Sequence, residues 1–332
     1  MQYVRRLWLA AACTLAFVVS ATAVQAQTTK FLPNDTELVV TFNLQQILKS
    51  EVLKDDAAKG LVDLIKGQVN QGLADKGLDK PLKTAGFDIF RDLVSITFAA
   101  PGGRPVEESF IVIEGKFDAA KIEAAGKEAG AGFKVIEIAS TKAFEIAPKG
   151  DKKMYVGILN EKILIACGSK ADFIEAVERL GGSKTAAFKA AVFKSLVETV
   201  SSKQSISFVA TGNILSKMAD KLPDGRGDQL KAAAPEVDGL SLSITVQKDL
   251  DVLLGVNAKD AKTAKQFAGL ANAGIRAARE KVAEKAKEDE KSKLALDVLK
   301  TVEATAKGSN LMIRGQVSFG NLGMILKNLP LP

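Results

Sequence analysis

The chain has 332 residues, with 46 lysines and arginines against 39 aspartates and glutamates, and it contains no histidine. Histidine is the usual general base near neutral pH and the commonest transition-metal ligand, so Ser-His-Asp catalysis, Cys-His catalysis and the ordinary zinc sites are excluded. The lysines are interleaved with acidic residues, which is typical of a solvated surface and disfavours nucleic-acid binding.

The first 26 residues have the pattern of a secretory signal peptide. Arg5 and Arg6 form a basic start, and the chain then carries no charge over 7–27. This stretch has an apolar centre and a small-residue end, with cleavage predicted after Ala26 and, as the close alternative, after Ala23. The pattern predicts an extracytoplasmic protein, periplasmic or secreted. The alternative is a protein tethered to the membrane by an uncleaved signal.

Removal of the signal changes the composition of the chain. Trp8 is its only tryptophan, and the loss of the two signal arginines lowers the net charge from +7 to +5. Cys167 is then the one remaining cysteine, so stability must come from a packed core rather than from an internal disulfide. Because Cys167 follows the apolar run 163–166, we expect a buried thiol rather than a reactive one.

The first half of the mature chain predicts alternating strands and helices: a strand at 37–42, a helical stretch from 43 to 73, strands at 93–99 and 110–117, and a helix at 118–130. Asn43 followed by Gln46 predicts a helix N-cap with its capping-box partner. Asp118 predicts the cap of the next helix.

The middle of the chain predicts a meander followed by two helices. Residues 133–167 contain three or four strands, with a tight turn at Asn160–Glu161. Ser169 and Asp172 predict a second capping box, for a helix that ends near Leu180. A further helix is expected over 185–201.

The second half of the chain echoes the first in three places. Residues 205–215, 238–246 and 252–262 resemble 39–44, 91–98 and 111–121, in the same order. The echoes indicate a duplicated strand–helix–strand–strand–helix module, with a first module at 27–202 and a second at 203–332. The identities are few, so chance similarity between like elements is the alternative.

The second module also contains a long charged stretch at 260–307. Apolar residues recur at helical spacing on both sides of the almost fully charged segment 284–293. This pattern predicts a helix exposed to water, and its broken apolar seam disfavours a coiled coil. A last strand is expected at 311–319. No segment after the signal is long and apolar enough to predict a membrane span.

Four short patterns are candidates for functional sites. The loop Asp224–Asp228 has an arginine at a ligand position of a calcium loop, and Gly181–Thr185 lacks the Gly-Lys pair of a phosphate loop. The acid pairs Asp55–Asp56 and Glu107–Glu108 are neighbours in sequence and rarely face each other. No catalytic, cofactor-binding or metal-binding residue is therefore predicted, and no cofactor.

Three segments carry a family resemblance. Leu32–Val40, Ala99–Gly103 and Glu114–Asp118 resemble uncharacterised exported proteins of planctomycete-type bacteria. The resemblance runs over most of the mature chain. It implies kinship and export, and it implies no activity or catalytic residues.

The predicted fold is α+β, with two related modules, each an antiparallel sheet with helices packed on one face. The leading functional hypothesis is a non-catalytic envelope protein that binds another envelope protein, a surface polymer or the cell surface. A carrier of an apolar small molecule, held between sheet and helices, is the alternative. A carboxylate- or lysine-based enzyme comes third. Oligomeric state and partner identity are left open.

Overall fold

The computed structural model describes residues 28–54, 56–75, 79–105, 108–128, 133–146, 153–200, 203–219, 228, 234–287, 289–318 and 320. Both predicted cleavage positions, Ala26 and Ala23, lie outside these residues, as do Asp55, Glu107 and residues 224–227. Across the described ranges, no helix combines the length and apolar character needed to cross a bilayer.

The first half of the chain contains seven described strands: β1 (Thr36–Asn43), β2 (Leu93–Pro101), β3 (Phe110–Gly115), β4 (Phe133–Ile138), β5 (Thr141–Ile146), β6 (Met154–Asn160) and β7 (Ile163–Cys167). Its helical elements are α2 (Leu44–Leu48), η1 (Val52–Lys54), α3 (Asp56–Asp75), α4 (Asp79–Thr84), α5 (Ile89–Asp92), α6 (Ala119–Glu128), α7 (Lys170–Leu180) and α8 (Ala191–Thr199).

Two helical predictions in this half need correction. The stretch 43–73 is broken after α2, because Val52 is buried and its N–H donates to the carbonyl of Gln247. The helix expected over 185–201 is α8 alone. The residues before α8 bind Asn34 instead, since the N–H of Ala187 donates to its Oδ1 and the N–H of Lys189 to its carbonyl.

The second half of the chain contains the strands β8 (Ile206–Thr211), β9 (Val237–Val246), β10 (Leu250–Ala258), β11 (Glu303–Lys307) and β12 (Asn310–Val317), together with α9 (Gly212–Ala219), η3 (Ala234–Glu236), α11 (Ala261–Lys285) and α12 (Glu290–Thr301). The single helix expected over 260–307 is therefore wrong. Asp289 starts a new helix by accepting from the N–H groups of Lys291 and Ser292. The residues after α12 turn at Gly308, which has a φ of +58°, and form a hairpin.

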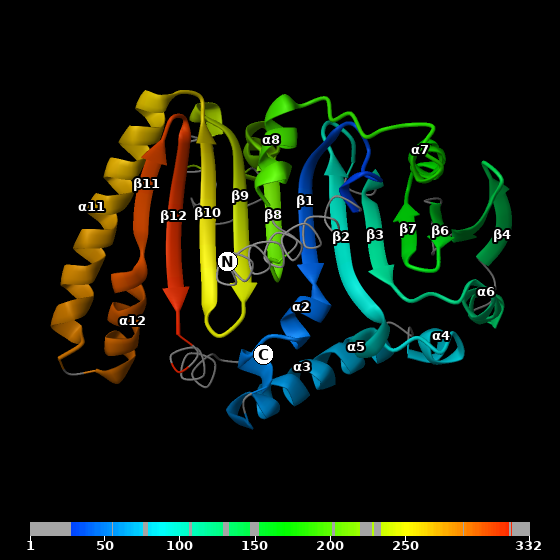
Figure 1. The fold of residues 1–332 in the computed structure, drawn as a ribbon, viewed down its shortest axis with the longest axis horizontal. Coiled ribbons are helices and arrows are strands. Elements are labelled where there is room, and N and C mark those ends of the chain that lie inside the picture. The colour runs from blue at the N-terminus through cyan, green and yellow to red at the C-terminus, as the bar shows by residue number, and fades with distance from the viewer. Residues whose placement is uncertain are drawn as a thin grey trace, which may run out of the picture.

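The described strands form one antiparallel sheet of twelve strands, in the order β11-β12-β10-β9-β8-β1-β2-β3-β7-β6-β5-β4 (Figure 1). The predicted α+β class is confirmed. Strands β1 and β8 pair directly over Leu38–Phe42 and Ile206–Ala210, so the two predicted modules share a continuous sheet. Their division into modules stays a prediction.

Helices cover both faces of the sheet near the β1–β8 pair. Successive side chains of a strand point to opposite faces. Val39 belongs to the apolar core that includes Phe193 of α8, whereas Leu38 packs in a separate core with Leu215 of α9. The cover at this junction is thus two-sided, where cover on one face was expected.

The segment before β1 is anchored inside the molecule. Phe31 and Leu32 are fully buried, and the buried guanidinium of Arg179 on α7 donates to both of their carbonyls. The same guanidinium donates to Asn34 at 2.7 Å and pairs with Glu175 at 2.8 Å. This anchor fixes the entry into β1.

A candidate anion-binding groove

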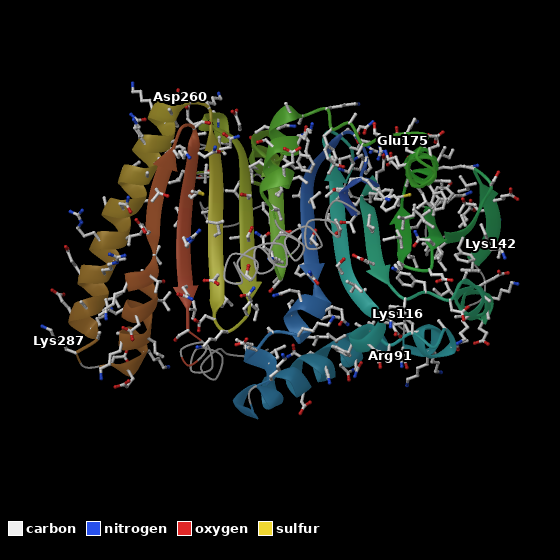
Figure 2. All side chains as sticks on the ribbon, viewed as in Figure 1. Arg91, Lys116, Lys142, Glu175, Asp260 and Lys287 are labelled. Atoms are coloured by element: carbon white, nitrogen blue, oxygen red, sulfur yellow. The ribbon has the colours of Figure 1, made fainter. Side chains whose placement is uncertain are left out.

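A groove of about 860 Å³ lies at one end of the sheet. It is lined by the loop before α5, the end of α5, the β3–α6 connection, the first turn of α6 and the β6–β7 turn. Figure 2 labels Arg91 and Lys116, which lie close together at this end of β2 and β3.

Main-chain hydrogen bonds join the end of α5, the β3–α6 connection and the β6–β7 turn around the groove. The N–H of Lys116 donates to the carbonyl of Asp92, and the N–H of Phe117 donates to the carbonyl of Glu161, both at 2.9 Å. Gly115 is required at this junction, because a Cβ there would lie 2.8 Å from the Asp92 carbonyl oxygen. The side chains around the groove therefore project from a fixed frame.

Four cationic side chains line the groove. Arg91 is 65% exposed and forms an ion pair with Asp92 at 2.6 Å, and its hydrogen bond holds the pKa of Asp92 below the usual range. Lys121 lies 3.7 Å from Asp118. In the part of the chain that the structure describes, no ion pair joins Lys116 or Lys162 to a carboxylate.

Apolar side chains complete the lining. The rings of Phe87 and Phe117 stack with their centroids 5.5 Å apart and their planes 8° from parallel. Ile122 and Ile158 also line the groove. A ligand here would meet exposed ammonium groups beside an apolar wall.

Two of the three acidic side chains that line the groove, Asp92 and Asp118, are already engaged, and the third, Glu161, is exposed in the β6–β7 turn. Asp118 accepts hydrogen bonds from the N–H groups of Ala120 and Lys121, so it caps the N-terminus of α6. Asp92 is held by Arg91 and by the N–H of Asp88. These contacts suit the binding of an anion by the lysines better than acid–base chemistry by the carboxylates. Among the described residues, no group of three or more His, Cys, Asp or Glu side chains could hold a metal ion.

A second charged cluster ties parts of the fold together. The guanidinium of Arg104, in the β2–β3 loop, lies 2.9 Å from Asp35 and 2.8 Å from Asp172 on α7. Its charge is thus paired with carboxylates from the N-terminal segment and from a helix. We interpret this cluster as structural.

Two candidates that the sequence suggested, Cys167 and the segment that begins at Gly181, have structural roles. Cys167 is 1% exposed, and burial raises the pKa of its thiol to about 12, so the prediction of a buried thiol is confirmed. Gly181 ends α7, and Lys184 pairs with Glu178 at 2.8 Å. The segment that begins at Gly181 is therefore a connection between helices rather than a phosphate loop.

Sequence reasoning missed the groove itself. Its cations come from three separate segments of the chain, and none is part of a compact motif. Two local patterns next to these cations are recognisable in the sequence: Asp118 predicts a helix cap, and Asn160–Glu161 predicts a turn. The pairing of β2 with β3 and of β3 with β7 brings these signals to one end of the sheet.

Comparison with known proteins assigns no family to the chain. No protein-family model and no curated protein matches it. Three solved structures of TP0453, a Treponema protein, resemble it. Crystal form III has 10% identity, form I 10% and form IV 9%, each with a TM-score of 0.45. The similarity covers 90%, 89% and 90% of this chain and 97%, 94% and 95% of the respective TP0453 chains.

Proposed function

We propose that this chain is a non-catalytic extracytoplasmic protein that binds an anionic envelope macromolecule or the anionic cell surface through the groove. The observation that carries the proposal is that Lys116 and Lys162, which line the groove, are exposed and outside any ion pair of the described residues. Export, with cleavage after Ala26, is part of the proposal.

The strength of such contacts points to a polymeric partner. An exposed lysine–carboxylate contact contributes only about 0.2–1 kcal/mol, so the groove would hold a single small anion weakly. In a polymer with many anionic groups, the first contact holds the other groups near the groove and raises their local concentration. The polymer therefore binds the groove more tightly than a single small anion does. Binding of this kind weakens with salt, since exposed charges are screened over about 10 Å at 0.1 M ionic strength.

The test reverses the charge of the groove. We expect the double variant Lys116→Glu, Lys162→Glu to bind immobilised poly-glutamate at least about tenfold more weakly than the wild type at low salt. The matched control is Lys262→Glu, Lys265→Glu, which changes the net charge equally at two exposed positions of α11. Biolayer interferometry at low and moderate salt measures both. Equal losses in the two variants would show that binding depends on overall charge, and the groove would then lose its assignment.

A pull-down from envelope extracts tests the partner itself. The wild-type protein should retain a specific component at low and moderate salt, and the groove variant should lose it while the α11 variant keeps it. An extract that yields nothing specific to the wild type would contradict the proposal. The mass of the exported chain, read by intact mass spectrometry, tests cleavage after Ala26.

We also infer that the two modules arose by duplication. From the β1–β8 pair outward, the sheet continues as β2 and β3 on one side and as β9 and β10 on the other. Each inner strand is followed by a short helix, α2 after β1 and α9 after β8. This equivalent placement supports the three sequence echoes.

A carrier of an apolar molecule is the second candidate, because one row of the sheet is apolar and incompletely covered. Phe42 is 47% exposed, and its direct cross-strand neighbours Ile96 and Ile206 are half-buried. Native mass spectrometry of the exported protein, before and after denaturation, tests this function. We expect a carrier to release a co-purified small molecule on denaturation, and a chain without one would remove the support.

A further inference from the structure

Strand β4 forms one edge of the sheet, and its outer side is uncovered in the described structure. It pairs with β5 on its inner side only. No other described residue forms a hydrogen bond with its main chain. Val135, in the middle of the strand, is 41% exposed. An open edge of this kind is a template for a further strand.

The turn after β4 decides which main-chain groups point outward. Ala139 and Ser140 both have positive φ, as in a two-residue hairpin turn, so the residues on either side, Ile138 and Thr141, form a hydrogen-bonded pair. Hydrogen-bonded and non-bonded pairs alternate along an antiparallel ladder. The N–H and C=O groups of Phe133, Val135 and Glu137 therefore point away from β5.

The same alternation of hydrogen-bonded and non-bonded pairs applies to β11, at the other edge of the sheet, where outward-pointing main-chain groups have hydrogen-bond partners. The turn at Gly308 and Ser309 makes Lys307 and Asn310 a hydrogen-bonded pair, so Ala304 points its main-chain groups away from β12. Both groups are satisfied by Asn272 of α11, whose Nδ2 donates to the Ala304 carbonyl at 2.9 Å and whose Oδ1 accepts from its N–H at 3.3 Å.

We propose that β4 pairs with β4 of a second copy of this chain, antiparallel, about a two-fold axis that passes through the Val135 pair. The three outward-pointing residues are centred on Val135, so each finds an outward-pointing partner: Val135 faces its own copy, and Phe133 faces Glu137. Such a pair would form about six main-chain hydrogen bonds, two for each hydrogen-bonded residue pair. A two-fold interface is self-complementary in this sense.

Charge selects this register over its neighbour. In the proposed register Lys134 lies opposite Ile136 of the other copy. A slip by two residues in one direction would place Lys134 opposite Lys134 of the other copy, and like charges directly opposite are destabilising. A slip by two in the other direction would place Phe133 opposite the turn residue Ala139, and only about four main-chain hydrogen bonds would remain. A slip by one residue would exchange the faces of the sheet, so that residues on opposite faces would oppose each other.

A cysteine at the axis tests the pairing. Cα atoms of a hydrogen-bonded pair lie about 5.5 Å apart, within the range that a disulfide spans. In full-length protein with Cys13→Ser, we expect Val135→Cys to form a disulfide-linked dimer under mild oxidation. Cys167 is buried and should not compete. The controls are Leu270→Cys, at a 70% exposed position of α11, and Lys134→Cys, which does not face itself. Similar dimer yields from all three variants, or no dimer from Val135→Cys, would overturn the proposal.

A proline at the same position gives an independent measurement. The N–H of Val135 takes no part in the β4–β5 ladder, so Val135→Pro should leave the monomer folded. We expect light scattering after size exclusion to show a dimer for the wild type and a monomer for Val135→Pro. A monomeric wild type at about 100 µM, or a folded Val135→Pro variant that remains dimeric, would refute pairing through β4.

Discussion

The two edges of the sheet are built differently. At β11, helix α11 lies along the outer side of the strand, and Asn272 satisfies both outward main-chain groups of Ala304 (Figure 1). At β4, helices α6 and α7 contact the strand, but none of their described side chains binds its main chain. At β11 a helix bonds the outward groups of Ala304, whereas no outward group of β4 has a hydrogen-bond partner among the described residues.

The difference gives the charged C-terminal helices a structural role. Arg279 of α11 donates to the carbonyls of Leu299 at 2.8 Å and Val302 at 2.6 Å, so α11 also caps the C-terminus of α12. The apolar side of α11 packs with Ala304 and Leu311 in a small core. These helices therefore act as an edge cover, and their lysines form its solvated outer surface.

The substitution with the largest expected effect removes the cover of β11. Asn272→Leu would leave the N–H and C=O of Ala304 without partners, and Ala304 is nearly inaccessible to water. An unsatisfied buried main-chain group costs about 1–3 kcal/mol, so we expect the free energy of unfolding to fall by about 2 kcal/mol. Urea unfolding with an unchanged m-value measures the loss.

A neighbouring position on the same helix supplies the control. Gln266 is exposed on α11, and Gln266→Leu should change the free energy of unfolding by less than about 0.5 kcal/mol. If Asn272→Leu were as stable as Gln266→Leu, the carboxamide would not close the edge. Strands β11 and β4 would then differ only in how far they are buried.

Local signals predicted the helix starts well. Asn43, Asp118 and Ser169 each accept a hydrogen bond from an N–H three residues later, as their capping patterns indicate. Such bonds depend only on nearby residues, so a single sequence contains the whole signal. Three or four strands were expected within 133–167, and the structure has four, because alternation and turns are local.

The errors arose where distant residues decide the structure. Glu303–Lys307 has the composition of a charged helix end, yet it pairs with Asn310–Val317 and contacts α11. Tertiary contacts of this kind override local propensity. The groove was missed for the same reason, since Arg91 and Lys162 meet only through strand pairing. Single-sequence patterns carry little information on such pairings.

The smallest expected effect separates the two edges by pH. Near β4, Glu123 of α6 lies 2.8 Å from Lys127 and 2.7 Å from Lys142, which holds the β4–β5 hairpin to the helix. Hydrogen bonds from Lys127 and Lys142 lower the pKa of Glu123 to about 2. Because the folded pKa is depressed, this stabilisation is present above about pH 4.3, the ordinary glutamate pKa, and is lost as the pH falls toward 2.

Amide hydrogen exchange can read this difference residue by residue. At pH 5, Glu123→Gln should lower the protection of β4 and β5 slightly, and at pH 2, where about half of Glu123 is protonated in the folded protein, most of this difference should be gone. Protection of β11 and β12 should be the same in both proteins at each pH, because the bonds of Asn272 involve neutral groups. A difference that persists undiminished at pH 2, or one that reaches β11, would mean that Glu123 acts through packing rather than charge. The acid sensitivity would then no longer distinguish the open edge from the closed one.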